Sequence, residues 1–204
     1  MLFQDTYKTI LKPAEGIFRD KGSKFIAYAI PIKAETEVKG IITNLKAGHS
    51  KARHHCWAMR LTPDRTVFKL NDDGEPSGSA GRPILNTLLF FDVTDIVVVV
   101  VRYFGGTLLG IPGLINAYKT ATTEALKSTE IIEKTLQDYY LLHFDYLNIN
   151  EVMRIVKENR LEITNQDFGN SCTLQIAVNK IQVNSVIEKL EKVDSIKIKY
   201  IESK

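Results

Sequence analysis

The stretch from Asn71 to Pro83 carries the side chains best suited to chemistry. Its sequence, NDDGEPSGSAGRP, gathers three carboxylates within four positions, two serines, three glycines and an arginine. Glycines permit backbone angles that other residues avoid, and the two prolines stiffen the segment, so we expect a structured loop without regular secondary structure. Carboxylates this close repel one another unless a cation or an arginine lies between them. We call residues 71–83 the acidic loop.

A second loop rich in glycine follows a strand-like run. Ile96–Val101 is an unbroken β-branched run, which indicates a strand buried on both faces. It leads into residues 102–113, RYFGGTLLGIPG, which we call the glycine loop. Pro112 suits the first turn of a helix. Apolar residues at helical spacing predict one inward face on that helix, made of Ile111, Leu114, Ile115, Tyr118, Ala121 and Ala125.

The glycine loop has the glycine spacing of a nucleotide-binding P-loop but lacks its chemistry. Four residues separate Gly105 from Gly110, as in that motif. Ile111 and Pro112 stand where the motif has the lysine that reaches the phosphates and the hydroxyl that holds magnesium, which argues against P-loop hydrolysis. A helix N-terminus still attracts anions, although glycines that allow close packing explain the same residues.

The carboxylates of the acidic loop fit a structural role better than a metal site. Asp72, Asp73 and Glu75 lack the spacing of a calcium-binding loop, so we predict no metal and no cofactor. An arginine fork suits a carboxylate well. We therefore expect some of these carboxylates to pair with Arg82 or Arg102, so that the two loops form one surface cleft.

Nucleophilic catalysis is poorly supported. Neither Ser77 nor Ser79 lies in a G-x-S-x-G motif, which argues against a serine hydrolase. Cys56 follows His55 directly, and adjacent strand residues point to opposite faces, so we expect a buried structural cysteine. Cys56 and Cys172 lie far apart without CxxC spacing, which favours reduced thiols. No catalytic residue is predicted.

Residues 46–60 are basic and aromatic and contain no acidic residue. Cations that neutralise phosphates beside a ring that stacks on a base are typical of a nucleic-acid surface. A solvated basic edge is the alternative, because a strand after Ala52 would place Trp57 in the core and divide the charges between its faces. The candidate nucleic-acid contacts are Lys46, Lys51, Arg53 and Arg60.

Composition bounds the class of protein. The chain has 204 residues, of which 44% are hydrophobic and 25% charged, as in an ordinary globular protein of one large or two small domains. Its net charge of +3 is too slight to indicate a nucleic-acid binder by itself. The longest apolar run is too short to cross a bilayer, so we expect a cytoplasmic protein without a membrane partner.

The second half of the chain predicts a compact series of elements. Gln137–Phe144 is strand-like, and a helical repeat begins at Ile149. Residues 161–166 and 172–178 flank a Gly169-Asn170 turn as a hairpin, and a last strand covers residues 196–200. Between them a helix capped by Asn179 is marked by Val183, Val186, Ile187 and Leu190. The order βαββαβ is that of the ferredoxin-like motif, whose default role is structural or docking.

The first half predicts an α+β or mixed α/β domain. Residues 16–19 and 24–32 form paired strands, residues 35–46 a helix and residues 53–61 a third strand. With the Ile96 strand and its helix, the first domain covers residues 1–130. The second domain covers residues 137–204, after a short linker.

The motifs DDGEPSGSAGRPIL and VVVVVRYFGGTLLGIPGLINAY closely resemble the signature of the Impact family, and in particular of its YigZ-like bacterial members. The chain has Ser79 where threonine is usual, Leu108 where lysine is usual, and Ile111-Pro112 where threonine and glycine are usual. The resemblance implies a first domain like a small-subunit ribosomal protein and the fourth domain of elongation factor G. It implies a second, ferredoxin-like domain similar to the last domain of that factor.

The resemblance also implies a function in translation and a set of residues that line the binding cleft. Eukaryotic Impact proteins restrain the starvation-activated kinase of the initiation factor, so the first hypothesis is a non-enzymatic, translation-associated protein. Its partner would be the ribosome, RNA or a translation-associated protein, with no sequence-specific DNA binding. The alternatives are an enzyme acting on a nucleotide-like or phosphorylated small molecule in the cleft, and a scaffold. The predicted cleft residues are Asp72, Asp73, Gly74, Glu75, Ser77, Ser79, Arg82, Arg102, Tyr103, Gly105 and Gly106.

Overall fold

The computed structural model describes residues 6–169 and 172–203. They form two compact units, one of them Tyr7–Lys134 and the other built mainly from the residues after it. In the first unit the β-branched run forms β6 (Ile96–Tyr103), the middle strand of a five-stranded antiparallel sheet. The sheet order is β2 (Ala14–Asp20), β3 (Ser23–Pro31), β6, β4 (His54–Leu61) and β5 (Val67–Asn71). The predicted pairing of the first two of these strands is confirmed.

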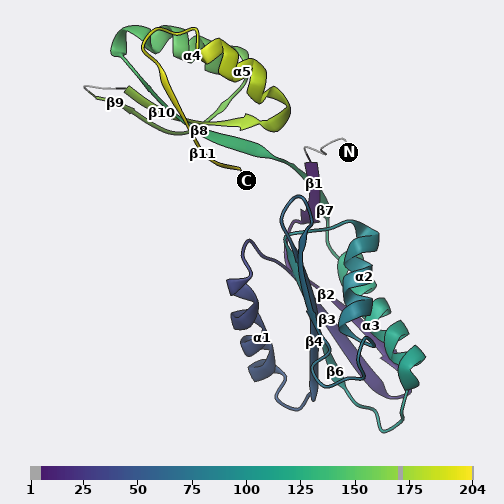
Figure 1. Ribbon diagram of the computed structural model, residues 1–204. Helices are drawn as coiled ribbons and strands as arrows, with labels where there is room; N and C mark the ends of the chain where they lie inside the picture. The colour runs from purple at the N-terminus through teal and green to yellow at the C-terminus, as the bar shows by residue number, and fades with distance from the viewer. Residues whose placement is uncertain (1–5, 170–171, 204) are drawn as a thin grey trace. The chain divides into compact units, whose positions relative to one another are not determined.

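Helices cover both faces of this sheet, as Figure 1 shows. On one face lie α2 (Gly81–Phe91) and α3 (Gly110–Lys127), and on the other lies α1 (Thr36–Gly48). The alternation of β6 explains this, because Val98 and Val100 join the core beneath α2 and α3, whereas Val97 and Val99 join the core beneath α1. A strand that is buried on both faces is the expected product of an unbroken valine run.

A separate two-stranded sheet joins the two ends of the first unit. It pairs β1 (Thr6–Ile10) with β7 (Ile131–Thr135). Sequence patterning did not predict either strand, because each has only five residues and pairs with a segment more than 100 residues away.

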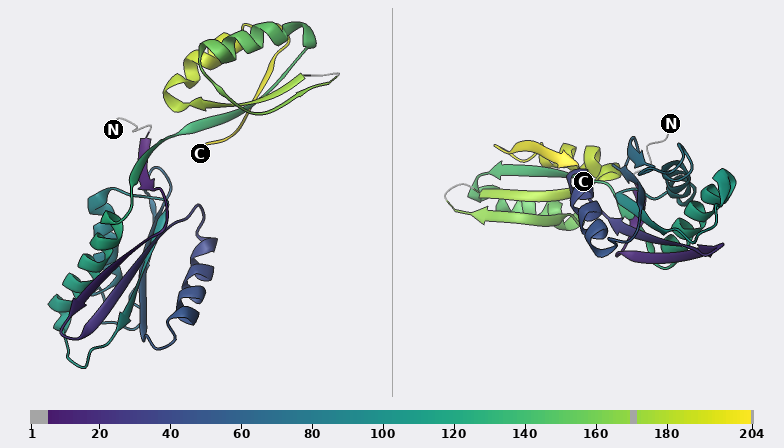
Figure 2. Two further views of the ribbon diagram at one scale, coloured as in Figure 1. Left: turned by 180° about the vertical axis from the view of Figure 1, so that it is seen from behind. Right: turned by 90° about the horizontal axis from the view of Figure 1, so that it is seen from below.

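The second unit contains the predicted elements in the predicted order. Its antiparallel sheet runs β11 (Lys197–Ser203), β8 (Gln137–Phe144), β10 (Cys172–Asn179) and β9 (Glu162–Phe168). The helices α4 (Ile149–Glu158) and α5 (Val183–Leu190) lie on one face (Figure 2), preceded by the short 3₁₀ turns Tyr146–Asn148 and Lys180–Gln182. The hairpin of β9 and β10 is confirmed, whereas Asn170 of its predicted turn lies outside the described residues.

Three local expectations were wrong. The acidic loop is not irregular throughout, because Asn71 ends β5 and Gly81, Arg82 and Pro83 form the first turn of α2. Asn179 does not cap α5, since a 3₁₀ turn intervenes and its side-chain amide oxygen accepts a hydrogen bond from Gln137. Ile111 and Ile115 were expected on the inward face of α3, but their side chains are 54% and 39% exposed.

None of the helices in the described part of the chain is long and apolar enough to cross a membrane.

Candidate functional site

Asp72 organises the acidic loop by accepting backbone hydrogen bonds. Its Oδ1 accepts from the amides of Ala80 and Gly81 at 3.1 and 2.8 Å, and its Oδ2 accepts from Gly78 at 2.9 Å. Helix α2 has no side-chain cap at Ala80, so the carboxylate of Asp72 fulfils that role from eight residues upstream. Its negative charge also lies at the positive end of the helix dipole.

Asp73 ties the acidic loop to β4 and α1. Its Oδ2 accepts a hydrogen bond from the backbone amide of His55 at 2.7 Å, and its Oδ1 lies 3.2 Å from Nζ of Lys46. Nδ1 of His54 lies 2.9 Å from the carbonyl oxygen of Asp73. Burial lowers the pKa of His55, although the nearby carboxylate of Asp73 opposes this shift.

Glu75 forms a buried ion pair that joins the acidic loop to the glycine loop. Its Oε1 accepts from Nη1 of Arg102 at 2.6 Å and from the hydroxyl of Tyr118 at 2.8 Å. The two charged side chains are only 3% and 7% exposed. The sequence-based expectation that a carboxylate of one loop pairs with Arg102 therefore agrees with the structure, whereas Arg82 is exposed on α2.

A buried thiol extends this network. Sγ of Cys56 donates to the carbonyl oxygen of Asp72 at 2.9 Å and lies 3.2 Å from the hydroxyl of Tyr118. Burial raises the pKa of both the Cys56 thiol and the Tyr118 phenol, so both groups stay protonated and act as hydrogen-bond donors. Cys56 is thus a buried structural cysteine, as its sequence context predicts.

The other predicted cleft residues of the acidic loop have different environments. The hydroxyl of Ser79 is buried and donates to the carbonyl oxygen of Pro76 at 2.6 Å, which gives it a structural role. Ser77 and Gly74 are exposed, and Gly74 adopts a left-handed φ of +86°. A glycine is required there because other residues rarely adopt that conformation.

The glycine loop is anchored to the β2–β3 turn. A Cβ on Gly105 would lie 1.9 Å from the carbonyl carbon of Gly22, and the amide of Gly105 donates to Oγ of Ser23 at 3.1 Å. Gly106, the next residue, has a φ of +88°. Close packing of the two backbones therefore explains the glycine at position 105.

Tyr103 lies on the opposite face of β6 from Arg102. Its hydroxyl lies 2.8 Å from Nδ1 of His49, whose Nε2 lies 2.8 Å from the hydroxyl of Tyr28. Arg102 instead contacts Phe25 in the core beneath α2 and α3. The period of two along a strand separates the two residues, so Tyr103 does not line the same cleft as Arg102.

A pocket of about 440 Å³ lies between the two loops. Its charged and polar wall consists of Arg53, His54, Glu75 and Arg102. Its apolar wall comes from Pro76 and from the glycine loop and first turns of α3, namely Phe104, Leu108, Leu109, Gly110, Ile111 and Leu114. The pocket stands where the cleft was predicted, but of the predicted cleft residues only Glu75 and Arg102 line it.

The basic segment does not form a single surface. Arg60 is 7% exposed, its Nη1 donates to the carbonyl oxygen of Val93 at 3.2 Å, and it faces Asp92 at 3.6 Å. Its selection as an RNA contact was wrong, because it lies seven positions after Arg53, roughly 23 Å along the strand, where its side chain is buried. Lys51 and Arg53 are exposed just before the other end of β4, and Trp57, within the strand, is half-buried.

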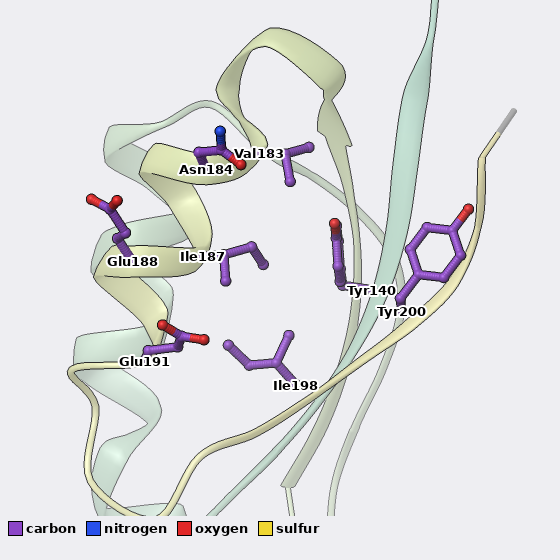
Figure 3. A pocket seen from close by; sticks show the side chains of 8 residues that line it. All are labelled: Tyr140, Val183, Asn184, Ile187, Glu188, Glu191, Ile198 and Tyr200. Atoms are coloured by element: carbon purple, nitrogen blue, oxygen red, sulfur yellow. The ribbon is translucent and has the colours of Figure 1, made fainter.

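The second unit carries a hollow of its own, of about 460 Å³, between α5 and the strands β8 and β11. Figure 3 shows Val183, Ile187 and Ile198 along its floor and the carboxylate of Glu191 turned towards Ile198. Glu188 points away from the sheet in the same view, and the rings of Tyr140 and Tyr200 contact each other edge to face at 5.7 Å. The hollow thus has an apolar floor, and of its two carboxylates only that of Glu191 faces inward.

Sequence reasoning missed the residues that complete the first pocket. Phe104, Leu109 and His54 line it and were not proposed as site residues. Tyr118, which was predicted as a core residue, lies outside the lining and donates a hydrogen bond to Glu75. The signal for Phe104 was its place beside Arg102, since its ring centroid lies 5.6 Å from Cζ of that arginine. In the described residues, no group of three or more His, Cys, Asp or Glu side chains is arranged to hold a metal ion.

Fold and site together define a two-unit α+β protein whose first unit holds a pocket between two glycine-containing loops. The family described as the Impact N-terminal domain matches residues 21–126. The IMPACT family members of Haemophilus influenzae and of Escherichia coli, the latter called YigZ, are each 33% identical over 172 residues, which is 83% of this chain and 84% of theirs. The chain belongs to the Impact family.

A solved structure supports the same fold over the whole chain. It is described as the crystal structure of a hypothetical protein, and it superimposes with a TM-score of 0.72 at 29% identity. The match covers 98% of this chain and 99% of that one, so both units are shared.

Proposed function

We propose that this protein is a non-enzymatic, cytoplasmic regulator associated with translation, and that it contacts ribosomal RNA through exposed cations of its first unit. Membership of the Impact family supports the link to translation, because eukaryotic Impact proteins restrain the kinase of the translation initiation factor. The single observation that favours binding over catalysis is the engagement of the acidic loop. Each of the carboxylates of Asp72, Asp73 and Glu75 is held by backbone amides, by a cation or by a hydroxyl.

The proposed RNA contacts are Lys51 and Arg53, just before β4. Both side chains are exposed, and no acidic residue lies between positions 46 and 60. Lys46 contributes less, because its ammonium group lies 3.2 Å from Asp73. Exposed lysine and arginine side chains neutralise phosphates and release counterions, which makes such binding steeply dependent on salt.

We also propose that the two units are the domains 1–130 and 137–204, the first like the fourth domain of elongation factor G and the second ferredoxin-like. The second proposal draws on the order βαββαβ and on the sheet order β11-β8-β10-β9. Resemblance to domains of a factor that works on the ribosome agrees with the proposed partner.

Co-sedimentation with ribosomes over a salt series tests this function. Lys51→Ala/Arg53→Ala should lower the logarithmic salt slope by about 1.4–1.8, which is about 0.7–0.9 for each lost phosphate contact. Lys119→Ala/Lys127→Ala, which removes two exposed cations of α3, is the control with the same loss of charge and should sediment like the parent chain. Equal sedimentation of the two double variants, or none for the parent, would refute the proposal.

A second candidate is an enzyme acting on a nucleotide-like or phosphorylated molecule, and the pocket beside Arg53 and Arg102 is the observation that favours it. A panel of nucleotides and sugar phosphates tests it, since selective binding must raise the melting temperature. A rise that depends on the phosphate, followed by turnover of the bound compound, would establish the enzyme in place of the regulator.

A further inference from the structure

We propose that the pocket between the acidic and glycine loops binds a small organic monoanion, namely a carboxylate carried on an apolar or aromatic body. This goes beyond the proposed RNA contact: Arg53 is common to both proposals, whereas Lys51 belongs to the RNA contact alone and the apolar wall to the pocket alone. It also differs from a phosphorylated ligand, because the walls of this pocket are mostly apolar.

The charges that line the pocket leave one positive charge uncompensated. Arg53 and Arg102 contribute two positive charges and Glu75 one negative charge, and His54 is the remaining titratable residue of the lining. Because Glu75 and Arg102 are 2.6 Å apart, the excess positive charge lies on the side of Arg53. A single negative charge on a ligand would balance it, whereas a dianion would leave an unpaired charge in a partly desolvated site.

Arg102 offers a hydrogen-bond donor that the protein does not use. Its Nη1 is bonded to Glu75, but its Nε is buried and has no acceptor among the described residues. The side chain is only 7% exposed and forms part of the pocket wall. A buried donor without a partner is costly, so a ligand acceptor that reaches this Nε from the pocket would recover free energy that the unliganded protein lacks.

The N-terminus of α3 adds to the attraction for an anion. This 18-residue helix begins at Gly110 with no side-chain cap, and both Gly110 and Ile111 line the pocket. The first amides of a helix have no intrahelical acceptor and carry the positive end of its dipole. Pro112 removes one of these amides, which fits two carboxylate oxygens better than the larger set of acceptors on a phosphate.

The apolar wall determines the rest of the ligand. Phe104, Leu108 and Ile111 are 50%, 82% and 54% exposed, which leaves large apolar surfaces in contact with water at the mouth of the pocket. Leu108 places an apolar side chain in the pocket lining, where a phosphate would favour a cation. A volume of about 440 Å³ lies in the ordinary range for small-molecule sites.

The test is an NMR titration of the ¹⁵N-labelled full chain with 3-phenylpropionate, with its uncharged amide and with inorganic phosphate. We expect 3-phenylpropionate to bind with a Kd on the order of 1 mM, which is weak affinity for a ligand of this size. It should shift the backbone amide signals of Gly110 and Ile111, which line the pocket, and the Nε–H signal of Arg102. The amide should bind at least tenfold more weakly, and phosphate should leave these signals in place.

Two variants and a control locate the ligand. Ile111→Asp places a carboxylate at the mouth of the pocket and should weaken 3-phenylpropionate at least tenfold, whereas Leu89→Asp makes the same change on α2 and should have no effect. Arg53→Gln should abolish the preference for the carboxylate over the amide. Equal binding of the two probes, shifts elsewhere, or no binding at all would overturn the proposal. Lys51→Ala should change ribosome binding alone, so the two proposals fail independently.

Discussion

Replacing Glu75 by glutamine should destabilise the first unit far more than the loss of an ordinary ion pair. The carboxylate is 3% exposed and is bonded to Arg102 and Tyr118, so Glu75→Gln leaves the guanidinium of Arg102 buried without its counter-charge. Breaking a buried pair from one side costs about 3–5 kcal/mol. Since whole domains are stable by about 5–15 kcal/mol, this is a large share of the total.

Urea unfolding of a double-mutant cycle measures this cost. Glu75→Gln/Arg102→Met removes both charges and should recover part of the loss of the single variant, with a coupling free energy above about 1 kcal/mol. Glu35→Gln is the matched control, because the pair of Glu35 with Lys69 is half exposed and should contribute about 0–1 kcal/mol. If Glu75→Gln costs no more than Glu35→Gln, the buried pair does not hold the two loops together and our account of the site is wrong.

Three further outcomes follow from individual residues. Because burial lowers the pKa of His55, the unfolded chain binds a proton at this histidine more readily than the folded chain does. The free energy of unfolding should therefore fall as the pH drops below about 6.5, by at most about 1.4 kcal/mol per pH unit for this group. Urea midpoints at about pH 7.5 and about pH 5.5 should differ less for His55→Gln than for the parent, and an equal difference would contradict this. Gly105→Ala should cost about 1–3 kcal/mol by overpacking against Gly22, whereas Gly40→Ala, in open space within α1, should stabilise by about 0.5–1 kcal/mol, as thermal denaturation can show. Asp72→Ala should cost about 1–2 kcal/mol and speed amide exchange at Gly78, Ala80 and Gly81, and unchanged exchange there would exclude the capping role.

Most of the fold was predictable because its elements carry local signals. The valine run of β6 indicates burial on both faces, β8 was predicted with the bounds that the structure has, and the apolar residues that marked α5 all lie within it. Helix α2 was missed although Pro83 and the apolar residues after it suit a helix. Its capping carboxylate belongs to Asp72, too far upstream to be read as a local cap, and Ala80 carries no capping side chain.

The candidate site was predictable only where charge and spacing carry the information. Pairing of a loop carboxylate with Arg102 follows from electrostatics, because carboxylates crowded into a glycine-rich loop need a cation. The face on which each residue lies depends on tertiary context. The period of β6 sends Tyr103 towards His49 and Arg102 towards the pocket, and the length of β4 carries Arg60 into the core while Arg53 stays at the pocket.

The same placement explains why one pocket can have an arginine floor and an apolar mouth. Arg102 is held from below by Glu75 and lies between the rings of Phe25 and Phe104, with its Cζ 5.5 and 5.6 Å from their centroids. Such an arrangement fixes the guanidinium before any ligand arrives, so little conformational entropy is lost when an anion binds. Truncation of Phe104 to alanine should therefore weaken the binding of 3-phenylpropionate by loosening Arg102 as well as by removing apolar contact. The NMR titration separates the two effects, because loosening broadens the Nε–H signal of Arg102 before any ligand is added.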